Sequence, residues 1–217
     1  MRGVFFDLDG TLLDTAPDLA FALNTLLVEQ GETALPFDTI RPHVSHGAGA
    51  LLRLGFGLDP EAGRGLELRG RLLEIYAANI ARETRPFPGI IELLDALEQR
   101  ALPWGVVTNK PAFLSEPLME QLDLGTRAAC IVSGDTLPQR KPHPAPLLHA
   151  AALAGLAADD CIYVGDAERD VAAGRDAGMH TIAVRYGYTQ ADGDPDSWGA
   201  SRVIDRPGEV LDSLPTR

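Results

Sequence analysis

Two aspartates, Asp7 and Asp9, stand two positions apart directly after a short apolar run at residues 4–6. A carboxylate is a suitable nucleophile toward phosphorus, with which it forms an aspartyl-phosphate. A second carboxylate nearby can give a proton to the leaving oxygen and later take one from water. The pair therefore predicts phosphoryl-transfer chemistry, although Asp-x-Asp-Gly taken alone, ending here at Gly10, is more typical of a turn.

A metal ion is the second expectation, because two carboxylates that face a phosphate dianion repel it strongly. Magnesium prefers a few carboxylate oxygens together with phosphate oxygens and water. Asp166 follows another apolar run, and Asp170 lies one helical turn further along the chain. The sequence thus predicts a Mg²⁺ site in which Asp166 supplies a ligand and Asp170 holds the ion or one of its waters.

Three other polar residues are expected to stabilise negative charge on the transferring group. Lys141 adds a positive charge beside the nucleophile, Thr108 offers a hydroxyl, and Asn109 offers its backbone N–H. Each of them is uninformative by itself. Their joint occurrence with the aspartates, in segments that follow apolar strands, is what makes the pattern specific.

Short apolar strands alternate with helices through the second part of the chain. Strands are predicted at residues 104–107, 130–132, 161–164, 181–184 and 203–204, and helices at 89–100, 112–122, 144–155, 168–177 and the end of the chain. Fully apolar strands in this alternation are typical of a parallel sheet covered by helices on both faces. The predicted fold class is therefore α/β, with a Rossmann-like parallel sheet whose ligands bind at the carboxyl ends of the strands.

A helical insertion separates the first strand from the rest of this sheet. Leucines between residues 19 and 76 recur at helical spacing, and the Pro-Phe-Pro-Gly run at residues 86–89 is typical of a stiff linker. We expect the insertion to cover the carboxyl edge of the sheet and to move about hinges near its two ends. The predicted organisation is an α/β core of residues 1–15 and 87–217 and a helical cap of residues 16–86.

Composition restricts the partners and the location of the protein. The chain has 217 residues and a formal net charge of −12, which argues against nucleic acid and anionic membranes as partners. No apolar run approaches the roughly 18 residues of a membrane span, and Asp7 interrupts the stretch that a signal peptide needs. We expect a cytoplasmic protein, monomeric or homodimeric, in which Cys130 and Cys161 are reduced, buried thiols.

The motifs resemble those of the haloacid dehalogenase superfamily, and the resemblance covers essentially the whole chain. Phe-Asp-Leu-Asp-Gly-Thr-Leu-Leu-Asp-Thr at residues 6–15 is similar to the first motif of that family. The second motif matches at Thr108, the third at Lys141, and the fourth at Asp166 and Asp170. The helical insertion directly after the first motif resembles the cap of subfamily I.

This resemblance implies roles for the matching residues. Asp7 is implied as nucleophile and Asp9 as general acid and base. The metal is implied to be Mg²⁺, held by the Asp7 carboxylate, the backbone carbonyl of Asp9 and the acidic motif of Asp166 and Asp170. One position departs from the pattern, because Ala167 stands where relatives often have Ser or Thr, and the missing hydroxyl is expected to weaken metal orientation modestly.

Within the superfamily, Asp9 places the chain with the phosphate-processing branch, since the true dehalogenases lack an aspartate there. Residues 107–111, 141–144 and 185–188 resemble phosphoglycolate phosphatases, which hydrolyse 2-phosphoglycolate to glycolate and phosphate. Residues 104–111, 174–178 and 196–200 also resemble N-acetylmuramic acid 6-phosphate phosphatases of cell-wall recycling. A small phosphorylated metabolite is the expected partner, with phosphoglycolate first and the sugar acid as alternative. A sugar phosphomutase and a non-catalytic binding module are further alternatives.

The cap is expected to choose the substrate, because the core motifs recognise only the phosphoryl group. Arg41 or His46 is predicted to touch the leaving group, and Gly10 and Asn109 are predicted to contact the phosphate. The segment of residues 42–49 is typical of a loop or helix start whose backbone N–H groups are free for an anion. Arg53, His43, Gly47 and Gly49 are the remaining candidates in the cap.

Overall fold

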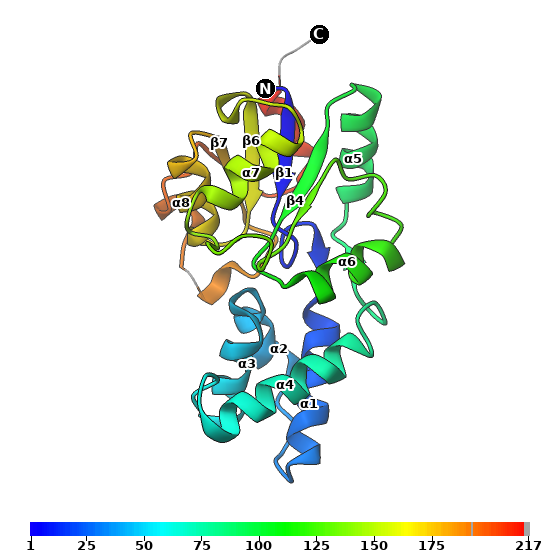
Figure 1. Ribbon diagram of the computed structural model, residues 1–217, viewed down its shortest axis with the longest axis vertical. Helices are drawn as coiled ribbons and strands as arrows, with labels where there is room; N and C mark the ends of the chain where they lie inside the picture. Colours follow the sequence, from blue (N-terminus) through cyan, green and yellow to red (C-terminus); the bar gives the residue numbers. More distant parts are fainter. Residues whose placement is uncertain (192, 215–217) are drawn as a thin grey trace.

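The computed structural model describes residues 1–191 and 193–214 (Figure 1). Its centre is a six-stranded sheet in the order β5-β4-β1-β6-β7-β8, in which every neighbouring pair is parallel. The strands are β1 (Gly3–Phe6), β4 (Trp104–Val107), β5 (Ile131–Val132), β6 (Cys161–Gly165), β7 (His180–Val184) and β8 (Arg202–Ile204). This architecture confirms the predicted α/β fold class.

Helices cover both faces of the sheet. Successive strand residues point to opposite faces, and because the central strands β1 and β4 are apolar throughout, both faces must be buried. Val4 and Phe6 of β1 belong to the hydrophobic cluster that two of the helices, α5 and α6, help to build. Phe5 belongs to a second cluster, on the face that α7 and α8 cover. These four helices are α5 (Ile90–Gln99), α6 (Ala112–Gln121), α7 (Ala145–Leu153) and α8 (Glu168–Asp176).

The strand register brings distant parts of the sequence to one edge of the sheet. Phe6 lies opposite Val106 of β4 on one side and Val164 of β6 on the other. Because all three strands run in the same direction, the chain leaves each of them at the same edge. Asp7, Thr108 and Asp166 follow these strands and therefore lie close together.

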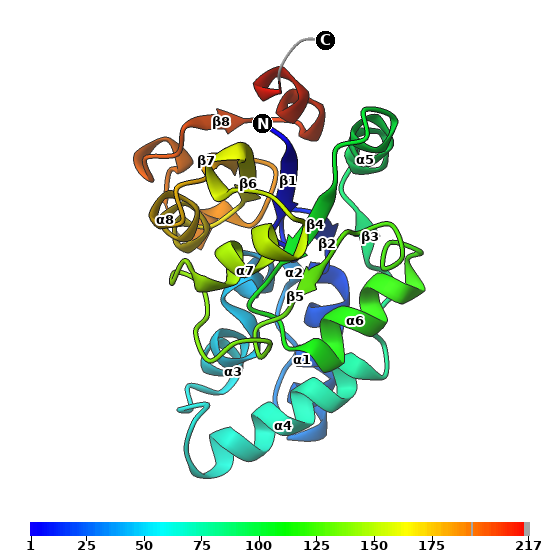
Figure 2. The same cartoon turned by 45° about the horizontal axis from the view of Figure 1, so that its top comes forward.

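The cap, residues 16–86, lies beyond this carboxyl edge (Figures 1 and 2). It contains α1 (Ala16–Glu29), α2 (Phe37–Ile40), the 3₁₀ helix η1 (Arg41–His46), α3 (Gly47–Phe56) and α4 (Gly63–Ala77). The chain crosses between core and cap through β2 (Leu13–Asp14) and β3 (Arg85–Pro86), which pair antiparallel. The exact limits given for the cap stay a prediction.

Asp18 ties the two crossings together at the start of α1. Its buried carboxylate accepts hydrogen bonds from the backbone N–H groups of Glu83 and Thr84 and from the Thr84 hydroxyl, at 2.7 to 3.1 Å. These hydrogen bonds satisfy the buried carboxylate and link the start of α1 to the segment that returns to the core. The cap is thus anchored where it enters and leaves the core.

Several details differ from the sequence-based expectation. The short pair β2 and β3 was not predicted, because two residues per strand are too few to show a periodicity. The end of the chain forms a 3₁₀ segment, η5 (Pro207–Ser213), where a helix was predicted. Cys161 is buried and Cys130 half-buried, and both thiols are free. In the part of the chain that is described, no helix combines the length and apolar character that crossing a membrane requires.

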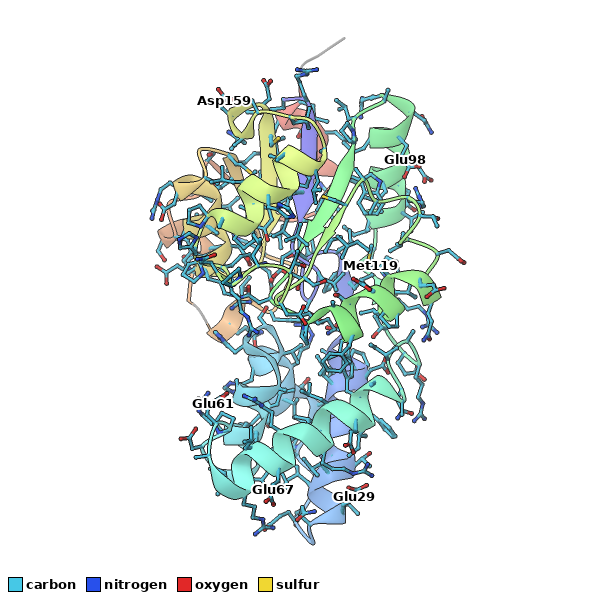
Figure 3. The ribbon with its side chains drawn as sticks, viewed as in Figure 1. Glu29, Glu61, Glu67, Glu98, Met119 and Asp159 are labelled. Carbon is cyan, nitrogen blue, oxygen red and sulfur yellow. The ribbon has the colours of Figure 1, made fainter. Side chains whose placement is uncertain are left out.

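The acidic excess of the chain is spread over its surface. Figure 3 labels Glu29 and Glu67 on the cap and Glu98 and Asp159 on the core, and all four are exposed. Exposed charges of this kind are solvated and screened by salt. The acidic groups that bear on function are the few that the fold buries at the carboxyl edge of the sheet.

Candidate active site

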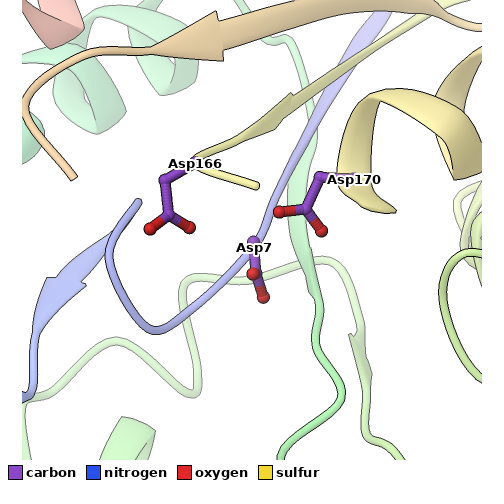
Figure 4. A group of neighbouring side chains, drawn as sticks. All are labelled: Asp7, Asp166 and Asp170. Atoms are coloured by element: carbon purple, nitrogen blue, oxygen red, sulfur yellow. The ribbon is translucent and has the colours of Figure 1, made fainter. Parts of the chain in front are cut away.

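Three aspartate side chains converge at the carboxyl edge of the sheet (Figure 4). Asp7 follows β1, Asp166 follows β6, and Asp170 lies in the first turn of α8. Each offers one oxygen within 4.8 Å of the other two, and none is more than 3% exposed. Since buried carboxylates must be paired or coordinate a metal, the fold concentrates here a charge that demands a cation.

Lys141 balances part of this charge. Its Nζ lies 2.8 Å from Oδ1 of Asp7 and 2.8 Å from Oδ1 of Asp170, and it donates to the Tyr163 hydroxyl at 2.8 Å. One ammonium can neutralise only one of the three carboxylates. Oδ1 of Asp170 also receives no well-directed hydrogen bond despite its burial. Oxygen donors with this charge fit a hard divalent cation such as Mg²⁺.

The backbone of Lys141 is held by the side chain of Asn109. The amide Nδ2 donates to the Lys141 carbonyl at 2.9 Å, and Oδ1 accepts from the Lys141 N–H at 3.0 Å. The sequence predicts Asn109 as a phosphate contact through its backbone. The structure shows in addition that its side chain positions the lysine that lies against Asp7.

The crowding of carboxylates shifts their pKa values upward. Burial raises the pKa of Asp7, and Asp170 raises it further, whereas Lys141 and Arg169 act in the opposite direction. Burial, followed by the charges of Asp7 and Asp170, raises the pKa of Asp166 to about 7. Without a further cation the cluster therefore holds protons that an isolated aspartate would release.

This shift predicts a pH-dependent stability of the metal-free protein. The pKa of Asp166 rises from 3.8 to about 7 on folding, so the folded chain binds more protons than the unfolded chain between these values. Stability must then fall as the pH rises through that interval, and it is greatest below it. In EDTA we expect the melting temperature of the wild type to fall between about pH 5 and about pH 8 relative to that of Asp166→Asn, and Mg²⁺ to restore it at the upper pH. Parallel pH profiles of the two proteins in EDTA would contradict this reading.

Gly10 takes a different part from the one predicted. Its N–H donates to the Leu13 carbonyl at 3.0 Å and so is not free to bind phosphate. Its φ of 86° suits glycine, and a Cβ placed there would lie 2.1 Å from Oδ2 of Asp166. Position 10 therefore requires glycine, because the backbone turns tightly beneath the Asp166 carboxylate.

Asp9 belongs to a second charged group beside the first. Its Oδ1 accepts from the Thr15 hydroxyl at 2.6 Å and from Lys110 Nζ at 2.8 Å. Burial opposes the charge on Lys110, but Asp9 and the adjacent Tyr76 outweigh it and leave the pKa of Lys110 above its ordinary value. The carboxylate of Asp9 stands apart from the three-aspartate group, and a metal contact through its backbone carbonyl stays a prediction.

A cavity of about 570 Å³ opens above these groups, between core and cap. Asp7, Asp9, Thr108 and Asn109 line it from the core. From the cap come the segment of residues 44–50 and several side chains, Leu19, Arg53, Pro60, Glu61, Arg69, Leu73 and Tyr76. Asp7 and Asp9 of the core and the side chains of the cap thus enclose one space.

The two cap residues predicted to touch the leaving group are placed differently from each other. His46 lines the cavity. Arg41 does not belong to the lining, because its guanidinium lies 4.8 Å from the ring centroid of Tyr188 and donates to the Gly187 carbonyl at 3.4 Å. The structure therefore gives Arg41 a contact between cap and core in place of the expected contact with the leaving group.

Sequence reasoning missed several residues of the site. Lys110 was read only as part of a motif, and Ser45, Tyr76 and Arg169 were assigned no role. One signal for Lys110 was available, because Lys110 and Lys141 are the only two lysines in a chain of 217 residues. In a chain that otherwise uses arginine, a compact ammonium at two positions indicates sites where a small, desolvated point charge is needed.

Known proteins resemble this chain over nearly its whole length. A model of the family described as haloacid dehalogenase-like hydrolase matches residues 4–184. A protein of Xanthomonas campestris pv. campestris (strain 8004) named phosphoglycolate phosphatase is 43% identical over 96% of this chain and 94% of its own length. A protein of Pseudomonas putida named N-acetylmuramic acid 6-phosphate phosphatase is 44% identical over 98% and 97%.

A solved structure shares the fold. The crystal structure of a predicted phosphoglycolate phosphatase from Haemophilus somnus 129pt superposes with a TM-score of 0.88, over 98% of this chain and 97% of that one. The two sequences are 24% identical. The likeness extends over both the sheet and the helical segment beyond its edge.

Proposed function

Because the chain belongs to the haloacid dehalogenase-like hydrolase family and is a phosphoric monoester hydrolase, we propose that Asp7 is its nucleophile and that it depends on Mg²⁺. The observation that carries this proposal is the buried group of Asp7, Asp166 and Asp170, only partly neutralised by Lys141. These three carboxylates would hold the ion. When bound, Mg²⁺ would neutralise charge on the phosphoryl oxygens and keep Asp7 ionised.

The contacts of Asp7 support its role. Oδ1 accepts from the Leu8 N–H at 2.7 Å and lies against Lys141, which leaves Oδ2 to attack phosphorus. In the first step the bond from Oδ2 to phosphorus forms as the bond to the leaving oxygen breaks, and Asp9 gives that oxygen a proton. In the second step Asp9 takes a proton from water, which attacks phosphorus and releases Asp7 and inorganic phosphate. Lys110 and the Thr15 hydroxyl hold the Asp9 carboxylate in place through hydrogen bonds to its Oδ1.

Two substrates are candidates, and the size of the cavity supports one of them over the other. The sequence predicts 2-phosphoglycolate first, and N-acetylmuramic acid 6-phosphate as the alternative. A cavity of about 570 Å³ falls within the roughly 300–1,000 Å³ of pockets that enclose drug-sized ligands. A two-carbon acid would leave most of this space to water, whereas an N-acetylated sugar acid would fill much of it. The cavity therefore favours the larger substrate.

Two side chains of the cap support a larger acidic substrate. The Tyr76 hydroxyl is buried, lines the cavity and has no hydrogen-bond partner of good geometry within the described residues, although Lys110 Nζ lies 4.5 Å from the centroid of its ring. A buried hydroxyl of this kind needs a partner, which a sugar oxygen or an amide would supply. Arg53 also lines the cavity and has no acidic partner in the described parts of the chain, while the neighbouring Arg69 is paired with Glu61. Arg53 is thus available for a substrate carboxylate.

Phosphate release from a panel of phosphomonoesters tests the substrate. We expect kcat/KM for N-acetylmuramic acid 6-phosphate to exceed that for 2-phosphoglycolate roughly tenfold or more, with all activity lost in EDTA. Arg53→Gln should raise KM for the sugar acid about tenfold, as loss of a charged hydrogen bond does, and leave glucose 6-phosphate unaffected. A preference for 2-phosphoglycolate would overturn the argument from size. Phosphoryl return to a sugar without release of phosphate would instead indicate a mutase.

The remaining expectations are not decided by the fold. A cytoplasmic location, a monomeric or homodimeric state and the absence of nucleic-acid and membrane partners stay predictions. They bear on the setting of the reaction and not on its chemistry.

A further inference from the structure

Ser45 of the cap contacts the proposed metal site directly. Its hydroxyl donates to Oδ2 of Asp166 at 2.9 Å. Ser45 lies in η1, the short helix that faces the core, and it is separated from Asp166 by 121 positions in the sequence. A side chain of the cap therefore takes part in holding a carboxylate that belongs to the core.

The Asp166 carboxylate is oriented by three donors. Oδ1 accepts from the Thr11 hydroxyl at 3.2 Å, and Oδ2 accepts from the Tyr188 N–H at 2.9 Å as well as from Ser45. Thr11 and Tyr188 belong to the core, so Ser45 is the donor whose position depends on the cap. The adjacent Ala167 has no hydroxyl. The Ser45 hydroxyl, which comes from the cap, donates to the Asp166 carboxylate instead.

Ser45 is itself held by the core. Arg169, which stands between the two acidic residues of the motif at the start of α8, donates from Nη2 to the Ser45 carbonyl at 2.8 Å. Ser45 thus gives a hydrogen bond to the core through its hydroxyl and receives one through its carbonyl. Arg41, four residues earlier in η1, adds its contacts with Gly187 and Tyr188. The cap is fastened to the core at the same place where a metal-binding carboxylate is oriented.

We infer that Ser45 and Arg169 form a clasp that couples the position of the cap to the magnesium site, so that Asp166 is fully oriented only when the cap is closed. The clasp makes Ser45 and Arg169 positioning residues, which act on the reaction through Asp166. By reciprocity, a bound ion that needs Asp166 in this orientation favours the closed cap. The inference rests on the proposed Mg²⁺ site and adds to it a dependence on the cap.

Binding of Mg²⁺ to the full-length protein without substrate, measured by calorimetry, tests the contribution of Ser45. Loss of a residue that orients a metal ligand weakens binding roughly 10- to 100-fold, so we expect Ser45→Ala to raise the Kd for Mg²⁺ by about tenfold. Ser45→Thr keeps the hydroxyl and should restore the wild-type Kd. Thr25→Ala is the matched control, because the Thr25 hydroxyl touches only the Phe21 carbonyl of its own helix. An unchanged Kd in Ser45→Ala would overturn the clasp.

The Arg169→Met variant distinguishes the clasp from a direct electrostatic effect of Arg169 on the binding of Mg²⁺. Arg169 is a positive charge near Asp7 and Asp166, and its removal would by itself tighten the binding of a cation. The clasp predicts the opposite sign, a Kd raised several-fold, because Ser45 is no longer held against Asp166. Arg140→Met removes another cavity-lining cation that takes no part in the clasp, and it should not raise the Kd. Tighter binding in Arg169→Met would overturn the inference.

Different results would contradict the proposed function and the clasp. A wild-type protein that binds no Mg²⁺ would contradict the proposed function itself. A wild-type protein that binds Mg²⁺, together with a Ser45→Ala variant that binds it equally well, would contradict the clasp alone.

Discussion

The Asp7→Asn variant is expected to lose phosphate release by a factor on the order of 10⁴ or more, since removal of a catalytic nucleophile costs up to about 10⁶ in kcat. An amide has nearly the same shape as a carboxylate but is too weak a nucleophile to form an acyl phosphate. The change also removes one of three crowded negative charges. We therefore expect the metal-free variant to be at least as stable as the wild type, and thermal melting in EDTA measures this beside the phosphate assay.

Asp159→Asn is the matched control for that substitution. It makes the same chemical change at an exposed position on the core surface and should leave both activity and stability unaltered. Substantial phosphate release by a well-folded Asp7→Asn protein would show that a residue other than Asp7 attacks the substrate.

Replacement of Lys141 by methionine is expected to produce the second largest loss. Lys141 Nζ lies between Asp7 and Asp170 and is almost fully buried. Loss of one preorganised donor to a developing charge typically lowers kcat about 10²- to 10³-fold, and we expect the upper end here because Lys141 also faces the nucleophile. Removing one partner of a buried ion pair should lower the free energy of unfolding in EDTA by about 3 kcal/mol or more. Urea unfolding and the phosphate assay measure the two effects.

The Lys110→Met variant is the control for Lys141→Met, because it removes the other buried lysine of the same site. Lys110 is the other buried lysine, but its ion pair is with Asp9, outside the three-aspartate group. Added Mg²⁺ should restore much of the stability that Lys141→Met loses, because the ion neutralises the carboxylates that no longer face a lysine. It should restore little of the stability that Lys110→Met loses. Equal recovery in both variants would contradict the separate functions given to the two lysines.

The parts of the fold that could be predicted are those whose neighbouring residues show a clear pattern, such as an apolar run that ends at a polar loop. The strand at residues 104–107 was predicted with its exact limits, because four apolar residues end at a polar loop. The convergence of Asp7, Thr108 and Asp166 followed from one rule, that parallel strands end at the same edge. The short 3₁₀ and two-stranded segments had no comparable periodicity, and they were missed.

The parts of the site that could not be predicted depend on contacts between distant segments. The pair of Lys110 and Asp9 spans 101 positions, and that of Ser45 and Asp166 spans 121. Neither contact follows from the spacing of residues within a motif. The first depends on how the loops after β1 and β4 pack in the core, and the second depends on the position of the cap over the core. Arg41 shows the same limit, since its charge suggested a substrate contact whereas the packing of η1 placed it against Tyr188.

The central claim, that Asp7 carries the phosphoryl group, is tested most directly by rapid acid quench during turnover. The protein would be mixed with Mg²⁺ and a substrate carrying labelled phosphate, and the quenched chain would be analysed for bound label. We expect label on the peptide that contains Asp7. Hydroxylamine should remove it, as expected of an acyl phosphate, and it should be absent from Asp7→Asn. Release of phosphate by the wild type with no label on the chain at any time would contradict the claim, and would mean that water attacks the substrate directly.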